Sequence, residues 1–455
     1  MRRCRAARQD RGVDIVELAD RLPELAATHE VPGAAVGLVL GGQTVQRCTG
    51  VTSTTDPLPV DPDTLFFWGS TTKTLTATAV MTQVEAGRVS LEDLVRDVLP
   101  ELRMQDPSAL DVLTVGMLLD HTGGWRGDGL VDTGWGQDAL ERAVREALPS
   151  EPQVTPPGTV ASYNNSALLV AGRLLEVLTG QPYPLAVSEL VLQPLGMDST
   201  WFLPWQVTGR RLAQGHLPGP SPLPGWPLAA ASLPGGGAVG SLVDHLTWAR
   251  WCLRGETEGT APLSEATRLL MQQPRVSMRS GLAAVGLSWL LQERGGVRLV
   301  THGGNVSNLQ LSTFVMVPEL DAAAVILTNA RGGHALGTEV VDGLLADVLA
   351  QPLPDALPTA AVANDLCGDY DAGAWRQRIT RDGERLFIQM VLDDQVPAEV
   401  RANFEKPPAE VLPVGRDQLA HATRPWEAAG DIGRDDAGRV AWLRWGMRVL
   451  PKVPG

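Results

Sequence analysis

Ser70-Thr71-Thr72-Lys73 is the stretch around which the other motifs of this 455-residue chain are arranged. A serine and a lysine three positions apart share one face of a helix, so the amine can accept the hydroxyl proton while the oxygen attacks a carbonyl. The S-x-x-K pattern is a signature of enzymes that form a serine acyl-enzyme. The alternative interpretation is an ordinary helix start with Ser70 as its cap.

Lysine usage favours a catalytic base at this position. Of the 38 basic residues only three are lysines: Lys73, Lys406 and Lys452. Arginine keeps its proton, whereas a general base must be able to lose one. Residues 74 to 84 carry no charged side chain, which indicates a helix buried on most sides. We therefore expect burial to lower the pKa of the Lys73 amine.

Composition excludes several classes of partner. A net charge of −14 argues against binding to nucleic acid or to an anionic membrane. The four cysteines are far apart and form no CxxC pair, so we expect no zinc site and no disulfide framework. No motif in the chain implies a metal or organic cofactor, so we expect none. No apolar run approaches the ~18 residues of a membrane span. After the basic start, acidic residues interrupt any apolar run before it reaches the length found in a signal peptide. We expect a cytoplasmic protein that acts on a small molecule or peptide.

The order of the predicted elements indicates an α/β domain followed by a small β-rich one. A helix over 13–28 and a hairpin over 34–51 come first, helices follow, and strands return between 286 and 330. This order predicts one sheet with strands from both ends of the domain and an all-helical insertion. The predicted organisation is a basic extension (1–12), a catalytic domain (13–350), a proline-punctuated linker (351–364) and a β-barrel (365–455).

Two further stretches could complete the chemistry. Tyr163 and Asn165 are two positions apart and would share one side of an extended segment. There Tyr163 could carry the leaving-group proton, and Asn165 could hold Lys73 or the substrate amide. His302-Gly303-Gly304 ends a predicted strand, where glycines allow a substrate backbone to approach closely. The alternatives are a half-buried loop tyrosine and a structural histidine at a turn.

Taken together, these motifs resemble the serine penicillin-recognising superfamily, which includes class C β-lactamases, D-specific peptidases, esterases and peptide cyclases. The three elements S-x-x-K, Y-x-N and H-x-G occur in the order of that superfamily, starting at Ser70, Tyr163 and His302. The resemblance implies a two-lobed α/β fold, in which helices flank an antiparallel sheet beside an all-helical lobe. Residues 366–370 (LCGDY) are similar to the opening of the lipocalin-like barrel in some D-peptidases and peptide cyclases.

The resemblance also implies roles for the reactive side chains. Ser70 would be the nucleophile, Lys73 and Tyr163 would share the proton transfers, and Asn165 would position them.

The third motif would serve the substrate. The backbone N–H groups of Ser70 and Asn305 would form an oxyanion hole beside Gly303 and Gly304, and His302 would face the substrate. With an unperturbed pKa near 6.5, His302 would be mostly neutral at pH 7 and would change charge between about pH 5.5 and 8. Lactamases of the superfamily have a lysine at this position, so we expect weak β-lactam hydrolysis at most.

Three hypotheses on function remain open from the sequence. The leading one is a serine hydrolase that acts through an acyl-enzyme on peptides, amides or esters, with D-amino-acid-containing peptides among its substrates. The second is a peptide cyclase, in which an internal amine resolves the acyl-enzyme using the same residues. The third is a non-catalytic binding or sensor module. The motifs do not separate hydrolysis from cyclisation, and they leave the oligomeric state open.

Overall fold

The computed structural model describes most of the chain, with gaps. The described residues are 13–129, 132–217, 221–223, 225–279, 283–350, 355–360, 365–373, 375–392, 396, 401, 404, 406–415 and 417–454. The predicted extension 1–12, and residues 351–354 and 361–364 of the predicted linker, lie outside the described residues.

The chain divides into two compact units. The first, called the sheet unit, comprises the described residues of Met1–Arg88, Leu178–Gln272 and Trp289–Pro352. The second, called the helical–barrel unit, comprises those of Val89–Val177, Gln273–Ser288 and Leu353–Gly455.

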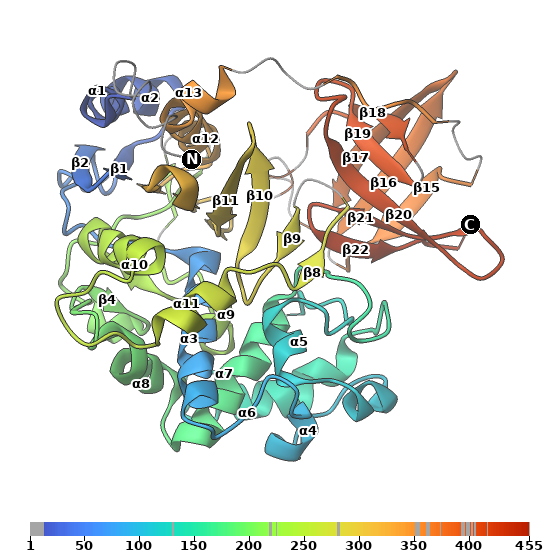
Figure 1. The fold of residues 1–455 in the computed structure, drawn as a ribbon, viewed down its shortest axis with the longest axis horizontal. Coiled ribbons are helices and arrows are strands. Elements are labelled where there is room, and N and C mark those ends of the chain that lie inside the picture. Colours follow the sequence, from blue (N-terminus) through green and yellow to red (C-terminus); the bar gives the residue numbers. More distant parts are fainter. Residues whose placement is uncertain are drawn as a thin grey trace, which may run out of the picture. The chain divides into compact units, whose positions relative to one another are not determined.

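An antiparallel sheet lies at the centre of the sheet unit (Figure 1). Its strands follow the order β2 (Gln43–Gly50), β1 (Gly33–Leu40), β14 (Ala322–Thr328), β13 (Gln310–Val317), β11 (Val297–Thr301) and β10 (Leu290–Arg294), and β12 (Gly304–Val306) pairs with β13 beside this path. The N-terminal hairpin joins the last strand, with Ala34 opposite Thr328 and Leu40 opposite Ala322. This pairing confirms the predicted sheet with strands from both ends of the domain.

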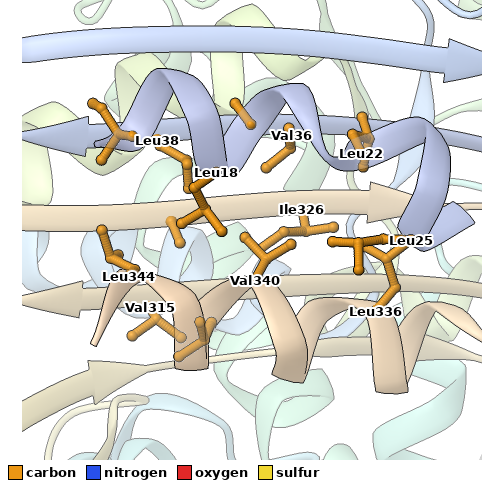
Figure 2. Packing of buried hydrophobic residues seen from close by; sticks show 14 of the residues in the cluster. Leu18, Leu22, Leu25, Val36, Leu38, Val315, Ile326, Leu336, Val340 and Leu344 are labelled. Carbon is orange, nitrogen blue, oxygen red and sulfur yellow. The ribbon is translucent and has the colours of Figure 1, made fainter. Parts of the chain in front are cut away.

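Helices α1 (Ile15–Asp20), α2 (Leu22–Thr28) and α12 (Gly333–Leu344) pack on one face of this sheet (Figure 2). Their apolar side chains meet those of the strands in one buried cluster, which includes Leu18, Leu22, Leu25, Val36, Ile326, Leu336 and Val340. The single helix expected over 13–28 is two helices, because Pro23 lacks the N–H that a continuous helix would use there. Proline fits instead in the first turn of α2.

On the opposite face, α10 (Leu242–Arg254) approaches β1 closely. A Cβ atom at Gly37 would lie 2.6 Å from a Leu246 methyl carbon, so a larger residue in the strand would push the helix away. Helix α3 (Thr72–Glu85) is buried along most of its length, as its lack of charge predicts. Its threonine hydroxyls donate hydrogen bonds to backbone carbonyls. For example, Thr74 Oγ1 donates to the Thr71 carbonyl (2.7 Å).

The helical–barrel unit contains helices and an eight-stranded antiparallel sheet. The helices and the short hairpin are α4 (Val95–Val98), α5 (Val115–Leu119), α6 (Ala139–Arg142), most of α7 (Asn165–Thr179), β8 (Val276–Ser277) and β9 (Ala284–Val285). The strands of the large sheet are β15 (Gly368–Asp371), β16 (Trp375–Asp382), β17 (Arg385–Leu392), β18 (Ala409–Val414), β19 (Gln418–His421), β20 (Ala428–Arg434), β21 (Val440–Trp445) and β22 (Arg448–Pro451).

This sheet curls into a nearly closed barrel, as residues 366–370 led us to expect. Each strand pairs with the next, and a bridge between Tyr370 and Lys452 brings the last strand beside the first. Tyr370 is fully buried, and its hydroxyl donates to the Leu366 carbonyl (2.5 Å). Among the described helices, none has the length and apolar character needed to cross a membrane.

Candidate active site

Ser70 lies on a tight turn between a strand and a helix. β3 (Phe66–Phe67) pairs with β7 (Val239–Gly240), and the 3-10 turn at Gly69–Thr71 then leads directly into α3. Gly69 has φ 52°, in the left-handed region that glycine adopts without a steric penalty. A Cβ atom there would also lie 2.9 Å from the backbone nitrogen of Asn305. Glycine at this position therefore lets the Asn305 segment pack against the turn that carries Ser70.

Lys73 is placed to exchange a proton with Ser70. Its Nζ donates to Ser70 Oγ at 3.1 Å and to the Gly235 carbonyl at 2.6 Å, and the side chain is fully buried. Gly235 belongs to α9 (Leu233–Gly236), which packs beside α3. The predicted contact between the two motif residues is present, at a distance within reach for general-base catalysis.

The third motif packs against the same turn. The His302 carbonyl accepts a hydrogen bond from Thr71 Oγ1 (2.8 Å), which ties the end of β11 to the turn that carries Ser70. At Gly304, where β12 begins, a Cβ atom would collide with the Trp68 carbonyl. These contacts bring the backbone of Asn305 beside the turn, as an oxyanion hole built from Ser70 and Asn305 would require.

The His302 ring is almost fully buried, with 1% exposure. Its Nδ1 lies 2.9 Å from the Gly303 carbonyl. Burial, followed by the nearby positive charge of Lys73, lowers the pKa of His302 from its usual value to about 3. The expectation of a ring that changes charge near pH 6.5 is therefore wrong, because a sequence does not reveal how completely a side chain is desolvated.

Because His302 is neutral, we can predict how substrate preference depends on pH. Because its lowered pKa leaves the ring uncharged at every pH well above about 3, the ratio of kcat/KM for a cephalosporin to that for a neutral ester should stay flat from pH 5.5 to 8. His302→Gln, which is neutral at all pH values, should give a profile of the same shape. A wild-type ratio that falls several-fold over this range, and is flat in His302→Gln, would show that the ring does titrate there.

Tyr163 lies in the helical–barrel unit, in the segment before α7. Its side chain is 7% exposed, and its ring centroid is 4.8 Å from that of His121. His121 adopts φ 62°, and its Nδ1 lies 3.3 Å from the Asn164 backbone nitrogen, which donates to it. His121 therefore contacts both the Tyr163 ring and the backbone of the segment that carries it.

Asn165 is the first residue of α7. Its backbone N–H donates to the Gly127 carbonyl (2.9 Å), and its side-chain Nδ2 donates to Asp128 Oδ1 (2.7 Å). Asp128 in turn forms an ion pair with Arg448 from the barrel. Within this unit, a carboxylate therefore orients the amide that we expected to hold Lys73 or the substrate.

The predicted site residues thus form two groups, each brought together within its own unit. The sheet unit holds Ser70, Lys73, His302, Gly303, Gly304 and Asn305, and the helical–barrel unit holds Tyr163 and Asn165. Within the described residues, no cluster of three or more histidine, cysteine, aspartate or glutamate side chains is suited to a metal ion.

Comparison with known proteins agrees with the fold. Residues 18–345 match the family model described as Beta-lactamase. This chain belongs to the beta-lactamase family. Penicillin-binding protein 4 of Amycolatopsis lactamdurans is 33% identical over 368 residues, which cover 77% of this chain and 96% of that protein. Unguisins hydrolase ungD' of Aspergillus campestris is 27% identical over 356 residues, 72% of this chain and 64% of that hydrolase.

Solved structures extend the likeness of this beta-lactamase-family protein to nearly the whole chain. A crystal structure of SurE with D-Leu matches with a TM-score of 0.72 and 25% identity, covering 96% of this chain and 99% of SurE. The octameric penicillin-binding protein homologue from Pyrococcus abyssi shares the fold at a TM-score of 0.65 and 19% identity, over 96% of this chain and all of that one. With hydrolases among its relatives, the chain is a serine hydrolase of the beta-lactamase family.

Two residues beside the Y-x-N motif of this beta-lactamase-family protein were not predicted from the sequence. Asp128 and Arg448 are 320 positions apart, so no local spacing connects them. The available signal was weak: Asp128 stands between Gly127 and Gly129, which marks a loop rather than a helix.

Proposed function

We propose that this beta-lactamase-family protein cleaves peptide, amide or ester bonds through an acyl-enzyme on Ser70, with D-amino-acid-containing peptides among its substrates. The observation that carries the proposal is the buried Lys73 amine 3.1 Å from Ser70 Oγ. If this stretch were only a helix cap, a side chain would form a hydrogen bond with the backbone at the start of α3. No side-chain cap hydrogen bond is present there.

In the proposed reaction, Ser70 Oγ attacks the substrate carbonyl carbon while its proton passes to Lys73 Nζ. The N–H groups of Ser70 and Asn305 would stabilise the resulting oxyanion. The tetrahedral intermediate collapses, the bond to the leaving amine or alcohol breaks, and that group takes a proton from Tyr163. Water then attacks the acyl-enzyme carbonyl and gives a proton to Tyr163. The bond to Ser70 Oγ breaks, Lys73 returns its proton to that oxygen, and the acid is released.

Two observations support the choice of substrate. The neutral His302 supplies no fixed positive charge for a β-lactam carboxylate, which favours neutral esters, amides and internal peptide bonds. The likeness to SurE, solved with D-Leu, supports a D residue in the substrate.

The experiment compares matched dipeptide methyl esters that end in D-Ala or L-Ala, with products identified by mass spectrometry. We expect release of the free acid, with kcat/KM at least about tenfold higher for the D ester, a difference of about 1.4 kcal/mol. Equal rates for the two esters would contradict the D-peptide assignment. A linear peptide ester that yields a ring instead of an acid would replace hydrolysis by cyclisation.

A further inference from the structure

The hairpin formed by β21 and β22 of the barrel is hydrogen-bonded to three successive residues just before α7. These bonds run from Arg444 Nη1 to the Ala161 carbonyl (3.0 Å), from the Val449 N–H to Ser162 Oγ (3.0 Å) and from the Tyr163 N–H to the Met447 carbonyl (2.8 Å). The barrel therefore fixes the backbone of the segment that carries Tyr163.

The turn has a defined and costly conformation. Trp445 pairs with Arg448, and the two residues between them, Gly446 and Met447, have φ 56° and 70°. Two positive φ angles are typical of the tight type I′ turn, whose twist matches that of the strands. Glycine adopts this region freely, but methionine rarely does. The strained residue is the one whose carbonyl accepts from Tyr163, which places the strain at the contact itself.

Arg448 connects this turn to both members of the Y-x-N motif. Its guanidinium carbon lies 5.0 Å from the centroid of the Tyr163 ring, a cation–π distance. The same guanidinium pairs with Asp128, through Nε to Oδ2 and through Nη2 to Oδ1 (3.1 Å). Asp128 Oδ1 also accepts from Asn165. The side chains of Arg448 and Asp128 are only 25% and 23% exposed, so solvent screens this pair partially.

We propose that the turn at residues 445–448 is a positioning element of the active site, in which Arg448 and Asp128 hold Tyr163 and Asn165 in the orientation that proton transfer requires. This inference rests on the proposed role of Tyr163 as the proton donor to the leaving group. A displacement of about 1 Å in such a group can cost about 10²-fold in rate. A cation at the ring also stabilises the negative charge that Tyr163 acquires when it gives up its proton.

The chain offers a matched control for Arg448. Arg385, also in the barrel, pairs with Glu410 (Nε to Oε1, 2.9 Å), and its guanidinium carbon lies 5.0 Å from the Phe387 ring centroid. It has the same two kinds of contact, but none of the contacts described here joins it to the Y-x-N motif. Arg385→Met therefore reports the cost of losing a barrel ion pair and a cation–π contact alone.

The test uses two esters of one acyl group, the one that wild type turns over fastest. A methyl ester needs its leaving alkoxide protonated, whereas p-nitrophenolate leaves without a proton. We expect Arg448→Met to lower kcat/KM for the methyl ester about 10- to 100-fold, and for the p-nitrophenyl ester less than about threefold. Arg448→Lys should recover part of the loss, and Arg385→Met should change neither rate. If Arg448→Met does not fold, Asp128→Asn, which keeps an acceptor for Asn165, should show the same difference between the esters at smaller size.

Tyr163→Phe separates this inference from the proposed function. We expect Tyr163→Phe to lower the methyl ester rate, and Arg448→Met to cause no further loss in that background, because coupled residues are not additive. A Tyr163→Phe variant with full methyl ester activity would overturn the proposed role of Tyr163. The positioning role alone would be overturned if Tyr163→Phe is damaging but Arg448→Met has only the effect of Arg385→Met. The same conclusion would follow if Arg448→Met slows both esters equally.

Discussion

Ser70→Ala should lower kcat/KM for the preferred ester by about 10⁴- to 10⁶-fold and abolish reaction with a serine-directed fluorophosphonate. The reason is that the hydroxyl oxygen forms the acyl bond, so nothing in the variant replaces it. Folding should be little affected. Ser70 Oγ accepts a hydrogen bond from Lys73, and Lys73 retains its bond to Gly235 in the variant, so the loss is about 1 kcal/mol.

A matched control for this variant is Ser264→Ala. Ser264 caps α11 (Glu265–Met271) and bonds the Glu85 carboxylate at the surface, so its loss should cost stability and leave labelling intact. Fluorophosphonate labelling that persists in a folded Ser70→Ala protein would place the nucleophile elsewhere.

Lys73→Arg should lower kcat/KM about 10³- to 10⁴-fold, nearly as much as loss of the nucleophile. Arginine does not release its proton at any working pH, so it cannot accept the Ser70 proton, and the variant loses the base. The side chain is fully buried, and the wider guanidinium must fit there, so the thermal unfolding midpoint has to be measured beside the rate.

Lys452→Arg is the control for this second variant. Lys452 donates to the Asp365 carbonyl near the closing edge of the barrel, where either cation can serve, so we expect wild-type turnover. Robust turnover by a folded Lys73→Arg would contradict the assignment of Lys73 as the base.

The parts of the fold and site that follow from local sequence were predictable. The contact between Ser70 and Lys73 follows from their spacing of three positions, which places both side chains on one face of a helix. The apolar runs that became β1 and β14 indicated strands, and the structure pairs the two from Ala34 opposite Thr328 to Leu40 opposite Ala322.

What escaped prediction depends on contacts between distant segments. The low pKa of His302 follows from burial and the charge of Lys73, and both depend on tertiary packing. In the sequence, Arg448 is one charged position in the alternating pattern of RVAWLRWGMRVL. Such a pattern is typical of a strand with one face in solvent. Only the folded chain shows that Arg448 meets Asp128 and Tyr163. Local periodicity carries no information on such pairs.

The most direct test of an acyl-enzyme on Ser70 is to quench wild-type protein with acid during turnover of the preferred ester. The mass of the intact protein is then measured, and peptide mapping locates any adduct. We expect a covalent adduct with the mass of the acyl group, located on Ser70 and absent from Ser70→Ala. Two results would contradict an acyl-enzyme on Ser70. One is steady turnover with no adduct, even after mixing times short enough to precede deacylation. The other is an adduct on another residue that persists in Ser70→Ala.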